Sequence, residues 1–242
     1  MIDSLGLLYN NNIIVNDNIS IHIPTIREIC EIGEEKYYSA ISTLCSSPYD
    51  YMVFLHDKLN IDYMDVSDFE MFLMFYKVID PDVIKLILCG IDFKLFDVVK
   101  NDAVNNFVIC DKKSKIIIDE TLYMLIVSYI RKIHMMERKN DLPGSRDTYN
   151  YLLEKERRKL RYNHHKNFES LLSPLISSMV NTSDFKYDYS SVWDLNIYLF
   201  MSSVQRISKK ENAGYVMQGI YTGNIDAKKI SSDAINWMSK IN

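Results

Sequence analysis

The clearest hydrophobic periodicity in the chain lies in the segment that follows Asp119. Apolar side chains recur there at i, i+3, i+4, i+7, i+8 and i+11, at Leu122, Leu125, Ile126, Tyr129, Ile130 and Ile133. This spacing places them on one face of an α-helix, and Asp119 stands where an N-cap is needed. The pattern predicts an amphipathic helix that buries this face.

Other helix starts are marked by capping chemistry. Thr25 and Ser67 are each followed three residues later by Glu, as in a capping box, and Asp80-Pro81 puts proline at a first helical position. We expect further helices at 34–45, 49–59 and 147–172, a helix from 193 toward 210, and a short last helix that Ser232 caps.

Short β-branched runs alternate with these helices at two places. Ile13–Val15 and Ile19–Ile23 flank an Asn-Asp-Asn turn, and Asn106–Cys110 and Lys115–Ile118 flank a polar turn. The sequence therefore predicts a predominantly helical α+β fold. It has a small N-terminal β element, one β-hairpin near 106–118 and a helical C-terminal half.

A polar break with Pro143-Gly144 separates the two halves. We predict an N-terminal α+β domain at 1–137, a linker or loop at 138–146, and a helical C-terminal region with a docking tail at 147–242. The expected helix at 147–172 has apolar ends and a polar middle. Such a helix crosses solvent or meets a partner.

The amino-acid composition limits the class of protein and the compartment that we expect. Hydrophobic residues make up 48% of the chain, and the formal net charge is −4. The four cysteines are never spaced as C-x-x-C, which is typical of reduced thiols in a cytosolic protein. Charged residues interrupt every apolar stretch, so we expect no membrane span and a cytoplasmic location.

Catalytic signatures are missing from the sequence. It contains no G-x-S-x-G, no G-x-G-x-x-G and no G-x-x-x-x-G-K-[ST] motif. His164 and His165 are adjacent, so on a helix they point about 100° apart and do not form a zinc pair. We expect no enzymatic activity, no cofactor and no metal site.

The basic run at 155–166 is the first candidate contact region. Its cations, among them Arg157, Arg158 and Arg161, spread around the whole helix circumference instead of forming a stripe. A solvated helix surface, an acidic protein partner and nucleic acid all remain open for this run.

The second candidate is the C-terminal motif Gly219-Ile-Tyr-Thr-Gly-Asn-Ile-Asp, followed by Lys228-Lys229-Ile230 and Trp237. In a structural interpretation, Gly219 permits a close backbone approach, Gly223 is the C′ glycine of a helix, and Ile225, Ile230 and Trp237 complete the core. In a functional interpretation, the same segment docks on another subunit. Trp237 is then the anchor, with Tyr221, Lys228 and Lys229 around it.

Two segments carry a resemblance to a known group of proteins. The first is 21–48, with Ile-His-Ile-Pro-Thr-Ile-Arg-Glu-Ile, Gly33-Glu-Glu-Lys-Tyr and Ser47-Pro-Tyr-Asp; the second is the C-terminal motif. Both resemble proteins encoded in structural operons of phages of low-GC Gram-positive bacteria. The resemblance implies a tail-morphogenesis protein, either an assembly chaperone for tape-measure or tube subunits or a minor structural component. It carries over no catalytic residues.

The expected function is therefore non-enzymatic, through protein–protein contacts during phage tail assembly. The client, presence in the virion and homo-oligomerisation remain open. The alternative is a nucleic-acid-binding module that uses the basic helix 155–166, which a steep salt dependence of binding would reveal.

Overall fold

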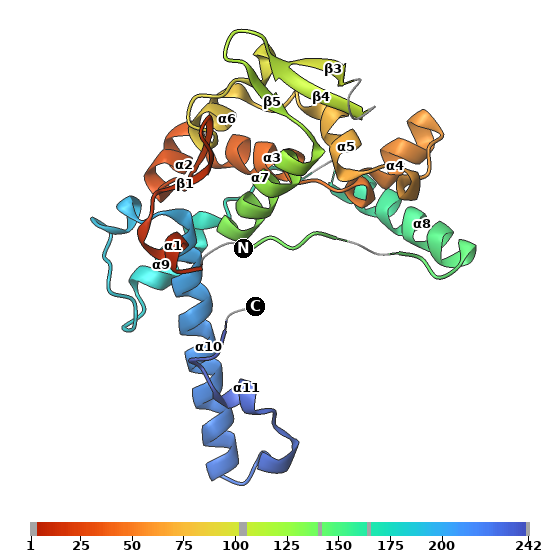
Figure 1. The fold of residues 1–242 in the computed structure, drawn as a ribbon. Coiled ribbons are helices and arrows are strands. Elements are labelled where there is room, and N and C mark those ends of the chain that lie inside the picture. Colours follow the sequence, from red (N-terminus) through yellow and green to blue (C-terminus); the bar gives the residue numbers. More distant parts are fainter. Residues whose placement is uncertain (1–3, 102–105, 140–141, 164–165, 241–242) are drawn as a thin grey trace. The chain divides into compact units, whose positions relative to one another are not determined.

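The computed structural model describes residues 4–101, 106–139, 142–163 and 166–240. The fold is α+β and predominantly helical, with a two-stranded and a three-stranded sheet, which confirms the predicted class. The chain forms two compact units, coloured by sequence in Figure 1. Unit 1 comprises Met1–Pro24 and Glu28–Ser170, and unit 2 comprises Thr25–Arg27 and Leu171–Asn242.

The N-terminal β element is a hairpin, as predicted. After α1 (Ser4–Tyr9), β1 (Asn12–Asn16) pairs antiparallel with β2 (Ile19–His22). The side-chain oxygen of Asn16 accepts hydrogen bonds from the backbone N–H groups of Asn18 and Ile19, both at 2.9 Å. This is the local bonding that makes Asn a favoured turn residue.

The second predicted hairpin belongs to a three-stranded antiparallel sheet. Its strands are β3 (Asp97–Asn101), β4 (Asn106–Asp111) and β5 (Ile116–Ile118), in the order β3-β4-β5. The Asp111 carboxylate accepts from the turn N–H groups of Lys113 and Ser114, at 2.9 and 3.1 Å. Strand β3 was not predicted, because its apolar part is only Val98-Val99 between charged residues.

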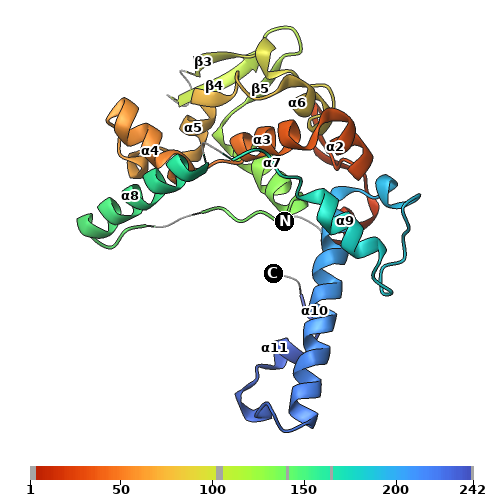
Figure 2. The same cartoon turned by 180° about the vertical axis from the view of Figure 1, so that it is seen from behind.

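Several helices build the rest of unit 1. They are α2 (Ile26–Ile32) from Glu28 onward, α3 (Glu34–Leu44), α4 (Met52–Phe54), α5 (Asp68–Phe75), α6 (Pro81–Ile87), α7 (Glu120–Ile133) and α8 (Arg146–Asn163). The predicted caps of three of them are present: Ser67 accepts from Glu70, Asp80 from Val83 and Asp119 from Leu122. Helix α8 contacts α4, which Figure 2 shows from behind.

Two predicted helices need correction. The segment 49–59 is divided among a 3₁₀ turn, η1 (Pro48–Tyr51), the short α4 and a π-helical turn, η2 (Leu55–Leu59). The helix expected at 147–172 ends at Asn163. The expected apolar end does not continue it: residues 166–170 are not helical, and Leu172 begins a separate helix in unit 2.

The helix predicted after Asp119 exists, but its buried face differs from the predicted one. Tyr123, Ile126, Val127, Ile130 and Ile133 are buried, whereas Leu125 is 41% exposed. The face is rotated because Tyr123 is drawn into an aromatic cluster. Its ring stacks on Phe72 at 4.5 Å between centroids, and its hydroxyl donates to the Leu44 carbonyl at 3.1 Å.

The predicted linker at 138–146 lies inside unit 1, and its residues 140–141 are outside the described part. Arg138 donates two hydrogen bonds to the buried Asp68 carboxylate at 2.8 and 2.9 Å, and Lys139 pairs with Asp50 at 2.7 Å. The first residues of this segment are therefore tied to the body of unit 1. As a division into independent domains, the predicted scheme stays a prediction.

Unit 2 is built on a helical core that includes a piece of the N-terminal region. Its elements are α9 (Leu172–Val180), the 3₁₀ turn η5 (Val192–Asp194), α10 (Ile197–Tyr221), the 3₁₀ turn η6 (Ala227–Lys229) and α11 (Ser232–Ile235). Ile26 is fully buried, its N–H donates to the Leu195 carbonyl at 2.9 Å, and Arg27 pairs with Asp194 at 2.9 Å.

Helix α10 differs from the prediction at both ends. It begins at Ile197 because the Asn196 side chain accepts from the Leu199 N–H at 2.8 Å, and it continues past residue 210 to Tyr221. The polar residues at 208–212 concealed this continuation. Among the described residues, no helix is both long and apolar enough to cross a membrane.

A partly buried hydrogen-bond chain joins α3 to the end of α7. The Tyr37 hydroxyl lies 2.5 Å from His134 Nε2, and His134 Nδ1 lies 2.7 Å from the Ile130 carbonyl oxygen. Because Nδ1–H donates to that carbonyl, Nε2 accepts from the hydroxyl and the imidazole is neutral. Burial of the ring lowers the pKa of His134 to about 4.

This chain predicts an acid-dependent loss of stability. Because the folded pKa of His134 is below the ordinary value of about 6.5, the unfolded chain takes up the proton first. Stability is full above pH 6.5 and falls as the pH drops toward 4. The loss is at most about 3 kcal/mol, since His134 is only half-buried as a residue.

Urea unfolding at pH 7 and at pH 4.5 measures this loss in the wild type and in His134→Gln, which keeps a neutral acceptor for Tyr37. The carboxylates titrate in both proteins, so the difference between them isolates the imidazole. An equal loss of unfolding free energy in both proteins would contradict the assignment.

Candidate interaction surface

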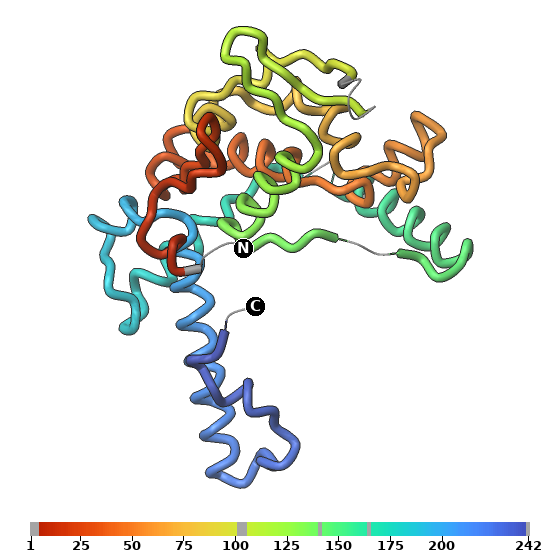
Figure 3. The backbone as a smooth tube through the Cα atoms, viewed as in Figure 1, coloured from red at the N-terminus to blue at the C-terminus, as the bar shows by residue number. Residues whose placement is uncertain are grey.

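Helix α10 ends in a Schellman motif. The Gly223 N–H donates to the Ile220 carbonyl at 3.0 Å, and the Asn224 N–H donates to the Gly219 carbonyl at 2.9 Å. Gly223 has φ 74°, which glycine adopts without the penalty that a Cβ brings. This confirms Gly223 as the predicted C′ glycine. The chain then reverses and returns along the helix (Figure 3).

We call the segment 203–240 the C-terminal hairpin; it comprises most of α10 and the returning tail. Its closest approach is at Gly219, whose carbonyl also accepts from the Ile225 N–H at 3.0 Å. A Cβ on Gly219 would lie 2.4 Å from Ile225 Cδ1 and 2.8 Å from Cγ1. The predicted close approach at Gly219 is confirmed. Both the backbone and the side chain of Ile225 lie against this glycine.

Two cations of α10 hold the far end of the tail. Arg206 donates to the carbonyl oxygens of Trp237 and Ser239, the second at 2.9 Å. Lys209 pairs with Asp233 at 3.2 Å and donates to the Lys240 carbonyl at 3.1 Å. Because the Ser239 hydroxyl and Lys209 both hydrogen-bond to Asp233, the pKa of this carboxyl is lowered. These bonds satisfy backbone carbonyls that no regular element pairs.

The tail does not form a buried core. Neither η6 nor α11 contains a buried residue, and Ile225 and Ile230 are only half-buried. Trp237 is 39% exposed and Tyr221 is 80% exposed. The tail thus packs on its own helix and still presents aromatic side chains to solvent, where they suit a contact that is part apolar and part wet.

The predicted cations of the hairpin lie at its surface. Lys228 and Lys229 are exposed, and in the described part of the chain neither has an ion-pair partner. The hairpin carries six Lys and Arg against three Asp and Glu, although the whole chain has a net charge of −4. This local excess of positive charge favours contact with an acidic surface.

Lys210 occupies an intermediate position. It pairs with Asp184 at 2.8 Å, and its Nζ lies 6.0 Å from the centroid of the Trp237 ring. Because Lys210 hydrogen-bonds to the Asp184 carboxylate, the pKa of that group is lowered. The indole is therefore flanked by a cation that is already neutralised within unit 2.

The cations of the second predicted region, on α8, do not form one basic face. Arg157 donates to both carboxylate oxygens of Asp57, with 2.9 Å for the Nε bond, and to Glu154. This bonding lowers the pKa of Asp57 to about 2. Arg158 and Arg161 are exposed, and His164 and His165 lie outside the described residues.

Sequence reasoning did not identify the two cations of α10 that bind the tail, and it did not identify two of the exposed apolar side chains of the hairpin. Tyr215 is 69% exposed and Met238 is 72% exposed, beside the predicted aromatics. Arg206 and Lys209 bind acceptors about thirty residues later in the chain. Their spacing of three on one helix face was the available signal, but it does not name a distant carbonyl as the acceptor.

No group of three or more His, Cys, Asp and Glu side chains gathers as a metal site would require, within the residues that the structure describes. Comparison with known proteins finds one correspondence. Residues 163–242 match the family model described as the YomV second domain. The matched segment nearly coincides with the C-terminal part of unit 2 and contains the motif of the phage resemblance.

No curated protein and no solved structure matches the chain significantly. The family correspondence therefore concerns the segment that bears the hairpin.

The packing at Gly219 yields a paired prediction. Gly214 and Gly219 both lie in α10, so replacing either by Ala raises helix propensity by about 0.5–1 kcal/mol. A Cβ at Gly214 meets nothing within 4 Å, whereas one at Gly219 collides with Ile225. We expect Gly214→Ala to stabilise the protein and Gly219→Ala to release the tail.

Limited proteolysis of the segment 222–240 and Trp fluorescence report the release. The double variant Gly219→Ala/Ile225→Ala removes the colliding side chain and should regain part of the helix gain. If Gly219→Ala protects the tail as well as Gly214→Ala does, the close approach is not a constraint.

Proposed function

We propose that this protein is a non-enzymatic phage protein that acts through protein–protein contacts during tail assembly, as a chaperone or a minor structural component. Its contact surface is the C-terminal hairpin. The clients that fit this role are tape-measure or tube subunits in the host cytoplasm. Homo-oligomerisation is compatible with the same surface.

The observation that carries the proposal is the exposure of Trp237 and Tyr221 on a scaffold that the chain builds for itself. Their neighbours in the tail, Lys228 and Lys229, add charge that no described acidic residue neutralises. Trp and Tyr side chains have only two rotatable χ angles, so they lose little freedom on binding, and they are enriched among residues that dominate interface energies. A tail that served only as a lid would bury its Trp.

The family match supports a modular role for this surface. Residues 163–242 correspond to a domain that is recognised as a unit in its own right, and they contain the whole hairpin. The match is consistent with a phage-associated protein. Assignment to tail assembly rests on the resemblance of the two termini to phage structural-operon proteins.

The alternative use of α8 as a nucleic-acid reader has weaker support. Arg157 is engaged by Asp57 and Glu154, and Lys159 by Glu156 at 3.4 Å. A cation that already has a carboxylate partner gives up that partner before it binds phosphate, which reduces the gain. Measuring DNA and RNA binding between 50 and 200 mM salt discriminates the two functions.

The functional prediction concerns Trp237. We expect wild-type protein to recover tape-measure or tube subunits from induced or infected cells at moderate salt, and Trp237→Ala to lose them. The melting temperature should change by only a few degrees, because the Trp237 carbonyl stays bonded to Arg206 and the indole is partly exposed.

Charge reversal at Lys228 and Lys229 to Glu should weaken the same capture. Tyr151→Ala is the matched aromatic control, because Tyr151 is 61% exposed on α8 of unit 1. Lys155→Glu is the charge control on the same helix. If Trp237→Ala instead lowers the free energy of unfolding by about 3–5 kcal/mol, as for a buried Trp, its role is structural. Equal loss of capture by Tyr151→Ala would point away from the hairpin.

A further inference from the structure

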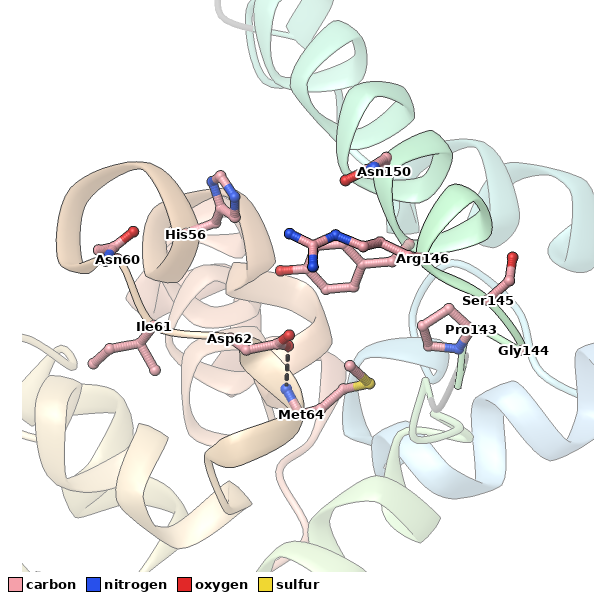
Figure 4. A pocket seen from close by; sticks show the side chains of 11 residues that line it. His56, Asn60, Ile61, Asp62, Met64, Pro143, Gly144, Ser145, Arg146 and Asn150 are labelled. Atoms are coloured by element: carbon pink, nitrogen blue, oxygen red, sulfur yellow. Dashed lines mark hydrogen bonds between the residues drawn. The ribbon is translucent and has the colours of Figure 1, made fainter.

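Unit 1 contains a cavity of about 570 Å³ that lies away from the C-terminal hairpin in sequence. Two segments line it: one runs from the π-helical turn η2 to the 3₁₀ turn η3 (Tyr63–Asp65), and the other is the start of α8 with the preceding loop. Figure 4 shows the side chains of both segments around the same space. A volume of this size suits a small organic ligand.

The cavity is supported by a rigid aromatic layer. Tyr149, which lines it, stacks on Tyr63 with 5.6 Å between ring centroids and 7° between planes. Both rings belong to a buried cluster that also contains Met52, Leu55 and Leu153. The backbone at Tyr149 and Tyr63, next to which the polar residues of the cavity lie in sequence, is therefore anchored in the core.

The backbone beside the cavity departs from a regular helix. Leu55–Leu59 forms a π-helical turn, and the following Asn60 is left-handed, with φ 56° and ψ 40°. Single π turns cost stability and occur frequently at functional sites. Here the turn carries His56 and leads into Asn60, and both residues line the cavity.

The carboxylates near the cavity already have partners. Asp57 receives Arg157 and also lies 2.8 Å from His56 Nδ1, which leaves the other imidazole nitrogen for the cavity. Asp62 accepts from the Met64 N–H at 3.0 Å as the cap of η3. Arg157 thus compensates the charge of Asp57, whereas Asp62 keeps its negative charge at the cavity, since no ion pair joins it to a cation among the described residues.

The positive charge of Arg146 is not paired with a carboxylate among the described residues. Across the described residues, its guanidinium forms no hydrogen bond or ion pair with the protein, and in Figure 4 it reaches from α8 into the space between His56 and Asp62. Arg131 and Arg138 of the same unit both bind the buried Asp68. Arg146 is exposed, as are Arg158 and Arg161, which also lack an ion pair among the described residues; Arg146 differs from them because it lines the cavity. An arginine that fills no structural ion pair and points into a cavity offers its planar donor set to a ligand.

We propose that this cavity binds a small anion through a carboxylate or phosphate group held by Arg146. Asn150 and Asn60 bring amide donors, and His56 brings its free ring nitrogen to the body of the ligand. The anionic group comes either from a phosphorylated metabolite or from a carboxylate such as a peptide C-terminus. The site is independent of the hairpin surface and of the function proposed for it.

The test is a titration of the full chain, followed by ¹H–¹⁵N NMR, with inorganic phosphate, with N-acetylglycine and with sodium chloride at matched ionic strength. We expect saturable shifts at residues 56, 60–62 and 146–150 with phosphate, N-acetylglycine or both, and none with chloride. The probe that binds more tightly distinguishes phosphate from carboxylate as the preferred group.

Arg146→Gln should weaken binding by about ten-fold or more, because one charge-assisted fork is lost. Asn150→Ala should weaken it less. Arg158→Gln, an exposed site on the same helix, is the matched control and should leave the affinity unchanged. Absence of saturable shifts with both probes, or an equal effect of Arg158→Gln, would overturn the site.

Discussion

The antiparallel return of the tail along α10 is the interaction on which the candidate surface depends. The Schellman motif at Gly223 starts the reversal, Ile225 packs where Gly219 has no side chain, and Arg206 holds the tail carbonyls near its end. Each contact is small by itself. Together they order a segment that has no buried core of its own. The loss of one such contact is therefore enough to disorder the tail.

The cations of unit 2 fall into two groups, those that bind acceptors within the chain and those that remain on the surface. Arg206, Lys209 and Lys210 are used within the chain, where they satisfy carbonyls and carboxylates. Lys228 and Lys229 remain on the surface with Tyr221 and Trp237. Exposed aromatic side chains are enriched in protein interfaces, and charges on the same segment orient the partner.

In unit 1, by contrast, the interior polar groups pair with one another. Its buried Asp68 binds two arginines, and Tyr37 and His134 satisfy each other, so its interior polar atoms are paired. Arg146 is an exposed residue without an ion pair among the described residues, and it differs from Arg158 and Arg161 because it lines the cavity. The two candidate sites therefore differ in physical type: the hairpin offers an exposed surface to a macromolecule, and the cavity offers directed donors to a small anion.

The sequence by itself determined the features that depend on neighbouring residues: the α+β class, both hairpins, the caps at Ser67, Asp80 and Asp119, and the C′ role of Gly223. Turn and cap bonds span two to four residues, so composition and spacing encode them. Only the tertiary structure decided which face of α7 is buried, that Arg157 is occupied by Asp57, that residues 25–27 belong to unit 2, and that Arg146 meets His56 in one cavity. These features depend on contacts across a hundred residues or so, where local patterns carry no information about the partner.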